Sequence, residues 1–196
     1  GTLEHVLARC DLRTDLYVFG NLSMDTLDYN GPRVNEGSKG VLLGVGDPIR
    51  ELPREFHGEL PAGVTKVRPY CGGCLVVEGP RAGDEPDAAA RIAAHDAFGD
   101  WPLVVLVDDA DQAARSDFNF LWVTFTRFEP AADLRAREVS LQRLHASFEP
   151  PVVIDARLKP DFPEELFCDE DTARRVESRW TEYFPDGGVE MGDSDR

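Results

Sequence analysis

The chain has 196 residues, of which 42% are hydrophobic and 11 are phenylalanine, so it can bury a sizeable core in one domain or in two closely packed lobes. Its formal net charge of −16 argues against binding to nucleic acid or to an anionic membrane surface, because each of these needs a basic face. No apolar run approaches the roughly 20 residues that cross a bilayer, and the opening residues lack the pattern of a secretory signal.

Four cysteines are present, namely Cys10, Cys71, Cys74 and Cys168, and only one pair of them is close in sequence. This usage favours a reducing cytosol over a secreted protein with a disulfide framework, so we expect a cytoplasmic location. The strong acidity otherwise reports on solubility and identifies no partner.

The first predicted element is an amphipathic helix, because Leu3, Val6, Leu7 and Cys10 keep helical spacing. A free thiol on such an apolar stripe behaves as a small hydrophobic side chain. An apolar strand at 17–19 follows the helix. Since no partner strand precedes the helix, we expect that the sequence continues upstream and that a neighbour encoded there covers the apolar side of the helix.

The next segments are short. Residues 28–32 form a predicted turn, because Asn, Gly and Pro each favour turn geometry. Residues 38–44 carry the signal of a short buried strand, and 47–56 is expected to be a proline-bounded connector with at most one helical turn. Runs rich in β-branched residues predict strands at 64–67 and 75–77.

The middle of the chain alternates helices and strands. An Ala-rich helix is expected over 84–97, closed by Gly99. A buried strand at 102–107 comes next, and a second amphipathic helix is predicted over 118–128, with Asp117 as its N-cap.

The last part of the chain begins at 134–148, where partly alternating polarity predicts an extended segment with one wet face. A short buried strand is predicted at 150–156. The closing helix is expected to begin near Asp169 or Asp171, and residues 186–196 have the composition of a flexible acidic tail.

One segment pattern occurs twice. Each amphipathic helix leads into an Arg, an apolar residue and an acid, and four positions after the acid come Asp-Leu and a strand-like run. Arg9 and Asp15 hold these places in the first copy, and Arg127 and Asp133 hold them in the second. Each Arg and Asp is expected to form a structural clamp across the turn. The predicted fold is α/β, with strand-helix-strand units packed around a mixed sheet and an internal repeat of a partial unit.

The predicted domain organisation has three regions. Residues 1–60 form the end of a first α/β unit, truncated at its amino terminus, together with a connector. Residues 61–185 form a second α/β unit with the closing helix, and residues 186–196 form the tail.

Cys71 and Cys74 are separated by two glycines. Two thiolates at this spacing can chelate a soft metal or run thiol exchange. A closed zinc site needs four ligands, and no second pair follows, since His57 and His95 are isolated. A tight turn into the strand at 75–77 is the simplest interpretation, and a metal site and a redox function remain the alternatives.

Residues 37–40 read Gly-Ser-Lys-Gly and invite comparison with a phosphate-binding loop. The Walker pattern places Gly-Lys-Ser/Thr directly before a helix, whereas Gly40 opens an apolar strand here. A structural loop is therefore expected, with contact between Lys39 and a carboxylate or phosphate of a substrate as the alternative.

Asp108, Asp109 and Asp111 follow the buried strand at 102–107, at a position where α/β proteins commonly place functional groups. These carboxylates can bind a cation or act as a general base. The alternative is that they cap the following helix and keep the edge of the sheet exposed to solvent.

Several of these segments resemble the carboxyl-terminal domain of UbiD-type decarboxylases. Residues 121–133, preceded by 104–109, are similar to that domain, and 24–29 followed by 37–40 resembles the closing motif of the family.

The resemblance extends over nearly the whole chain, from Leu3 to Trp180. The run at 19–56 and the segment at 71–77 are most similar to the longer branch of the family, which is assigned to menaquinone biosynthesis through the futalosine route.

The resemblance implies a carboxy-lyase that acts on an aromatic or unsaturated acid. It implies prenylated flavin mononucleotide (FMN) as the cofactor of the parent enzyme, with a divalent metal and potassium at the flavin phosphate. Protons are handled in the family by a Glu-Arg-Glu set of the amino-terminal domain, which nothing in this chain matches. The carboxyl-terminal domain mainly makes oligomer contacts and covers the active-site entrance, and the region after Asp133 is a candidate lining of the substrate pocket.

The chain is therefore expected to be inactive alone and to associate with itself or with the flavin-binding domain or subunit of the same enzyme. Two alternatives are a natural small subunit of a heteromeric UbiD-type (de)carboxylase and a non-catalytic assembly module. His5 and His145 lack the Ser, Cys or Asp context of a catalytic triad. We assign no catalytic, cofactor-binding or metal-binding residue in this chain.

Overall fold

The computed structural model describes residues 1–163 and 168–187. Contacts group Gly1–Phe162 into one compact unit and Pro163–Arg196 into a second. The second unit contains α6 (Glu170–Ser178) and α7 (Trp180–Tyr183). Within the described ranges, no helix is long and apolar enough to cross a membrane. The predicted domain boundaries at residues 60 and 185 stay predictions.

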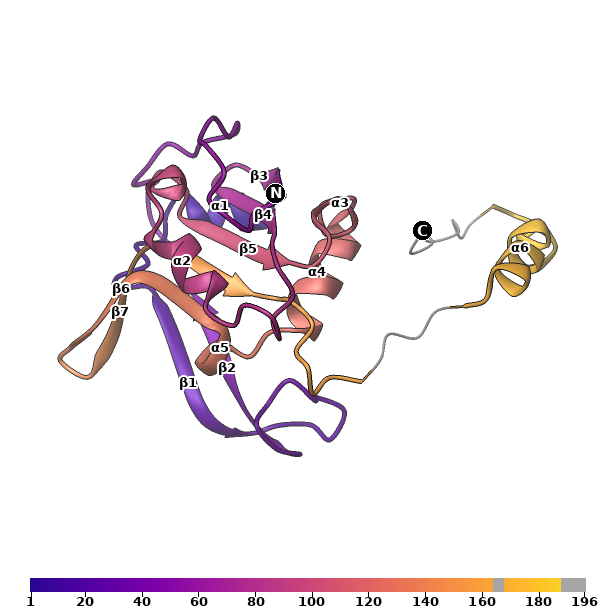
Figure 1. The fold of residues 1–196 in the computed structure, drawn as a ribbon, viewed down its shortest axis with the longest axis horizontal. Coiled ribbons are helices and arrows are strands. Elements are labelled where there is room, and N and C mark those ends of the chain that lie inside the picture. The colour runs from indigo at the N-terminus through magenta and orange to yellow at the C-terminus, as the bar shows by residue number, and fades with distance from the viewer. Residues whose placement is uncertain (164–167, 188–196) are drawn as a thin grey trace. The chain divides into compact units, whose positions relative to one another are not determined.

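The first unit is built around a mixed five-stranded sheet (Figure 1). Its strands, in spatial order, are β3 (Lys66–Cys71), β4 (Cys74–Glu78), β5 (Leu103–Val107), β7 (His145–Asp155) and β6 (Leu134–Gln142). The three central strands are parallel, and each edge strand is antiparallel to its neighbour. All five residues of β5 are buried, as is typical of a parallel strand that is covered on both faces.

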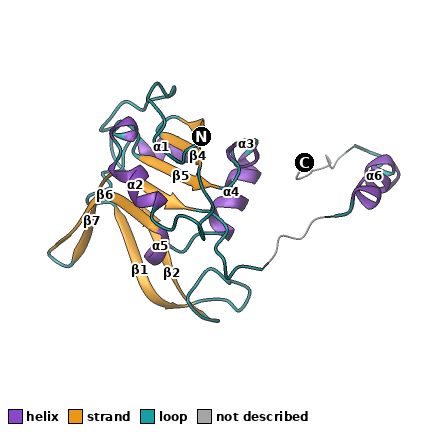
Figure 2. Ribbon diagram, viewed as in Figure 1, coloured by secondary structure: helices purple, strands orange, loops and turns teal. Residues whose placement is uncertain are grey.

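Helices lie on both faces of this sheet (Figure 2). One face packs against α2 (Ala88–Ala94) and the short 3-10 helix at Asp96–Phe98, which together replace the single helix predicted over 84–97. The other face packs against α1 (Thr2–Leu7), α3 (Ala110–Ala113) and α4 (Asp117–Thr126). The predicted α/β fold with a mixed sheet is therefore confirmed.

A separate two-stranded antiparallel sheet is formed by β1 (Leu16–Ser23) and β2 (Glu36–Leu42). The prediction of a buried strand at 38–44 is wrong, because only Gly37 and Ser38 are buried within β2. The expected loop at 37–40 is wrong as well, since these residues lie within β2, and Gly37, Lys39 and Gly40 pair with β1 on either side of a register shift. Small and polar residues here form a strand, although their composition is typical of a loop.

The apolar side of α1 is covered by the chain's own core, contrary to expectation. Leu7 and Cys10 are fully buried and share a cluster with Val105 and Phe120. Burial, with Asp15 close by, raises the pKa of the Cys10 thiol to about 12, so this side chain stays neutral at physiological pH. The helix therefore packs as part of this domain.

The two copies of the sequence pattern share one local hydrogen bond. The Asp15 carboxylate accepts from the Asp11 backbone N–H at 2.8 Å, and Asp133, at the end of α5 (Pro130–Asp133), accepts from the Glu129 N–H at 2.7 Å. The surroundings differ, because β1 and β2 form their own sheet whereas β6 and β7 belong to the central one. The two copies therefore resemble each other in their helix-to-strand turns.

The segment predicted as one extended stretch over 134–148 is in fact a hairpin of β6 and β7. Arg143 and Leu144 make its turn with φ of 51° and 68°. The N-cap of α4 is Ser116, whose hydroxyl accepts from the Asn119 N–H, in place of the predicted Asp117. The predicted start of the closing helix at Asp169 is confirmed by its bond from the Thr172 N–H.

Candidate functional site

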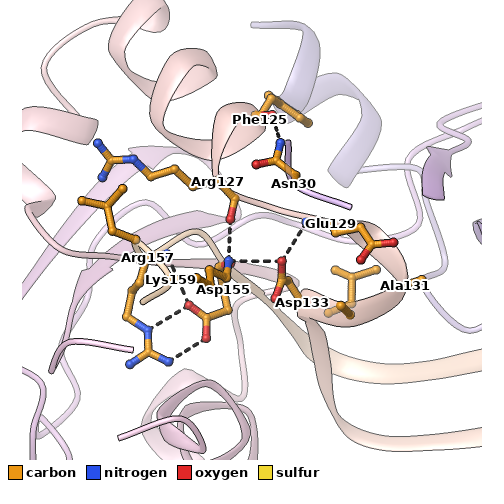
Figure 3. A network of polar contacts seen from close by, with 12 residues as sticks. Asn30, Phe125, Arg127, Glu129, Ala131, Asp133, Asp155, Arg157 and Lys159 are labelled. Atoms are coloured by element: carbon orange, nitrogen blue, oxygen red, sulfur yellow. Dashed lines mark hydrogen bonds and ion pairs between the residues drawn. The ribbon is translucent and has the colours of Figure 1, made fainter. Parts of the chain in front are cut away.

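The carboxyl ends of β5 and β7 lie side by side because the two strands are parallel, with Leu106 opposite Asp155. Charged side chains from three parts of the chain meet at this edge. The resulting network contains three cations and three carboxylates: Arg127, Arg157, Lys159, Asp108, Asp133 and Asp155. Figure 3 shows all of these except Asp108 with labels. The formal charges of the network are balanced.

Arg157 is the fully buried member of this network. Its Nε and Nη2 donate to the two carboxylate oxygens of Asp155 at 2.8 and 2.6 Å. Its Nη1 donates to the carbonyls of Pro80 and Glu85 at 2.7 and 3.0 Å. A guanidinium removed from water must be paired and hydrogen-bonded in this way, so Arg157 ties the end of β7 to the segment that follows β4.

Lys159 links the sheet edge to the end of α4. Its Nζ lies 3.1 Å from the Asp133 carboxylate and donates to the Asp155 carbonyl at 2.7 Å and to the Arg127 carbonyl. Arg127 in turn lies 3.4 Å from Asp108. The predicted Arg127–Asp133 clamp is thus replaced by pairs with Asp108 and Lys159.

Likewise, the predicted clamp between Arg9 and Asp15 does not form. The Arg9 guanidinium donates to the carbonyls of Gly46 and His5, each at 3.0 Å, while Asp15 bonds within its own turn.

Each of the three predicted carboxylates after β5 has structural partners. Asp108 accepts from the Leu158 backbone N–H at 2.8 Å. Asp109 caps α3 by accepting from two backbone N–H groups. Asp111 contacts Lys66 and Arg68, each at 2.7 Å, and the hydrogen bond from Lys66 lowers the pKa of its carboxyl group. The helix-capping interpretation therefore fits Asp109.

The two thiols of the Cys-Gly-Gly-Cys segment face each other across the turn that joins β3 to β4, with Cys71 opposite Cys74. Gly73 has a φ of 81°, a conformation that favours glycine. The predicted tight turn is confirmed. Among the residues with a described placement, no group of three or more His, Cys, Asp or Glu side chains is arranged to hold a metal.

The two thiols of this turn differ in environment. Cys74 is completely buried, and burial raises its pKa, whereas Cys71 is partly exposed and a hydrogen bond from Cys74 lowers its pKa. Since the thiolate is the reactive form, Cys71 is the more nucleophilic member of the pair.

We expect iodoacetamide at pH 7 to modify Cys71 at least about tenfold faster than Cys10 or Cys74, in a Cys168→Ser background that removes the exposed fourth thiol. Peptide mass spectrometry over a time course measures the rates. Cys74→Ala should slow the reaction of Cys71, because its thiolate loses a hydrogen-bond donor. Equal rates at Cys71 and Cys74 would contradict the assignment.

Ser38 connects β2 to the start of α5. It precedes Lys39, for which contact with a carboxylate or phosphate of a substrate was the alternative prediction. The Ser38 hydroxyl donates to the Glu129 carboxylate at 2.9 Å and accepts from the Ala131 N–H at 2.9 Å. Lys39 is exposed on the same strand. This arrangement docks the hairpin on α5.

His57, His95 and His145 each contact another described residue. His95 accepts from the Ala97 N–H and so caps the 3-10 helix. His145 Nε2 lies 3.1 Å from the Arg13 carbonyl, and His57 lies 3.5 Å from the Glu55 carboxylate.

Helix α4 carries a row of exposed apolar side chains, formed by Phe118, Leu121, Trp122 and Phe125. Their spacing places them on one side of the helix, and they are 53–72% exposed, while Phe120 and Val123 face the core. Phe118 and Trp122 stack with ring centroids 6.1 Å apart. A contiguous row of large apolar side chains on a surface marks an interaction site. We call this row the α4 face.

Comparison with known proteins matches residues 2–44 to the 3-octaprenyl-4-hydroxybenzoate carboxy-lyase C-terminal domain, the UbiD C-terminal family. An uncharacterized protein of Chlamydia trachomatis is 42% identical over 93% of this chain. A Chlamydia pneumoniae protein, named as a subunit of 4-hydroxybenzoate decarboxylase, is 39% identical over the same share. The chain spans 31% of the length of each of these relatives.

Among solved structures, the chain is similar to the vanillic acid decarboxylase of Sedimentibacter hydroxybenzoicus in its open form. The TM-score is 0.38 at 17% identity, over 63% of this chain and 30% of that one. The matched segment at residues 2–44 contains α1 and the β1–β2 hairpin, which pack on the central sheet. Residues 2–44 are therefore similar to the UbiD carboxyl-terminal domain, and the chain as a whole is similar to a part of these longer relatives.

Proposed function

We propose that this chain is the oligomerisation and active-site-covering part of a UbiD-family carboxy-lyase that decarboxylates an aromatic acid precursor in menaquinone biosynthesis. The family match and the decarboxylase name of the Chlamydia pneumoniae relative support the reaction class. The choice of menaquinone precursor rests on the motifs at 19–56 and 71–77. A cytoplasmic location is part of the proposal, supported by four free thiols.

The α4 face is the observation that carries this proposal. Leaving Phe118, Leu121, Trp122 and Phe125 in water is unfavourable, since each large apolar side chain gains about 1.5–3 kcal/mol on full burial. Aromatic anchors of this kind dominate the energetics of protein interfaces. The face is therefore suited to cover a second copy of the chain or the flavin-binding part of the enzyme.

The charged groups of the domain support a role outside the chemical step. Arg157 and Lys159 donate to carboxylates and carbonyls within the network, and Asp108 and Asp133 accept from it. Prenylated FMN, a divalent metal and potassium are proposed for the parent enzyme only. Among the described residues, no group of three or more His, Cys, Asp or Glu side chains is arranged to hold a metal. We derive no catalytic step in this chain.

A natural small subunit of a heteromeric decarboxylase is the second candidate, favoured by the word "subunit" in the name of the Chlamydia pneumoniae relative. The two candidates differ in covalent connection and not in what the domain contacts, so the α4 face serves the same purpose in both. A non-catalytic assembly module is the third candidate.

The proposal is tested by supplying the purified chain with prenylated FMN, Mn²⁺ and potassium and measuring CO₂ release from an aromatic acid. We expect no release above the protein-free control, because the groups that act on the substrate belong to another part of the enzyme. Turnover of a carboxylated naphthoquinone precursor by the chain alone would contradict the proposal.

A further inference from the structure

An apolar cavity of about 140 Å³ lies between α4 and the β1–β2 hairpin, on the face of the central sheet that packs against α1, α3 and α4. Aliphatic and aromatic side chains form its walls, among them Leu12, Leu42, Leu103, Phe120 and Ile154. Among the residues with a described placement, no charged side chain lines it. An occupant of this cavity must therefore be neutral and mostly apolar.

Among the described residues that line this cavity, Thr124 is the one with a polar side chain. Thr124, on the inner side of α4, is 1% exposed, and its hydroxyl oxygen has no hydrogen-bond partner among the described residues. Leaving a buried hydroxyl unpaired costs roughly 1–3 kcal/mol. A ligand that hydrogen-bonds to Thr124 recovers this cost.

The size and polarity of the cavity define the ligand. Water is a poor occupant because it needs two to four polar partners, and the walls supply one hydroxyl. A dry apolar cavity of about 150 Å³ is known to accept a benzene ring. Phe125 also lines the cavity and is 57% exposed, so the cavity reaches the protein surface beside it.

We propose that this cavity binds a small neutral aromatic alcohol of the size of phenol, with its ring between the apolar walls and its hydroxyl paired with Thr124. The threonine hydroxyl both donates and accepts, as does a phenol, so the pair is satisfied in either direction. This site goes beyond the proposed function, because it lies within one domain and needs neither flavin nor a partner chain.

The test uses the 196-residue chain, with phenol and toluene as probes in titrations followed by NMR. The wild-type chain should bind both. Thr124→Val keeps the shape of the side chain and removes the hydroxyl, so it should weaken phenol binding by about three- to tenfold and leave toluene binding within about twofold. Unchanged phenol affinity in this variant, or no binding of either probe to the wild type, would overturn the proposal.

A matched pair of variants on β2 locates the site. Leu42→Phe puts extra volume into the cavity and should abolish binding of both probes, whereas Val41→Phe, on the neighbouring and more exposed position, should leave both affinities intact. If Leu42→Phe fails to fold, nuclear Overhauser effects from phenol to the methyl groups of Thr124 and Leu42 in the wild type decide the location. Effects to other methyl groups alone would refute it.

Discussion

Replacing Arg157 with methionine is expected to lower the free energy of unfolding by about 3–5 kcal/mol. The substitution removes four hydrogen bonds and leaves the Asp155 carboxylate buried without its cation. Breaking one partner of a buried ion pair has this large effect because the remaining charge stays desolvated. Urea denaturation followed by circular dichroism measures the change.

Arg137→Met is the matched control for this experiment. Arg137 pairs with Asp96 at 3.1 Å at the surface, where the Asp96 side chain is almost fully exposed. An exposed pair contributes about 0–1 kcal/mol, so this variant should stay within that range. Adding Asp155→Leu to Arg157→Met should recover part of the loss, since no charge is then left alone. Equal stability of the two single variants would show that the network does not hold the sheet edge.

Replacing Trp122 with glutamate is expected to make the chain monomeric at concentrations where the wild type self-associates. Trp122 lies in the middle of the α4 face, and a charge there must be desolvated whenever the face is covered. Loss of a central aromatic anchor weakens an interface by at least about 2 kcal/mol, or roughly thirtyfold in the dissociation constant. Sedimentation equilibrium at micromolar concentration measures it.

Leu144→Glu supplies the control, because Leu144 is also a strongly exposed apolar residue but lies in the turn between β6 and β7. It should leave association unchanged. Both variants should keep the wild-type melting temperature within a few degrees, since neither side chain is part of the core. Self-association of the Trp122→Glu variant at wild-type strength would exclude the α4 face as the contact surface.

The buried strands of the central sheet could be predicted because β4 and β5 are uninterrupted runs of apolar, mostly β-branched residues. The hairpin of β6 and β7 could not, because Arg143 and Leu144 make its turn without the glycine or asparagine that usually marks such a turn. The exposure of β2 could not be predicted either, since its buried positions are Gly37 and Ser38 and its apolar Val41 is exposed.

Three of the six residues of the charged network, namely Asp108, Arg127 and Asp133, could be predicted from the sequence. Asp108 follows a recognisable buried strand, which is why it was singled out. Arg157 and Lys159 could not be linked to it, because they come about 50 residues later. The parallel pairing of β5 and β7 brings their segment to Asp108, which accepts from the Leu158 backbone N–H. A signal was available in principle, since both lie within four residues of the end of the buried part of β7.

The most direct test of the central claim is to add this chain to the separately expressed flavin-binding part of the same enzyme, loaded with prenylated FMN, and to measure CO₂ release from an aromatic acid. We predict release only from the mixture, together with co-elution of the two polypeptides. Release by the flavin-binding part at the same rate without this chain, or by this chain without the flavin-binding part, would contradict it.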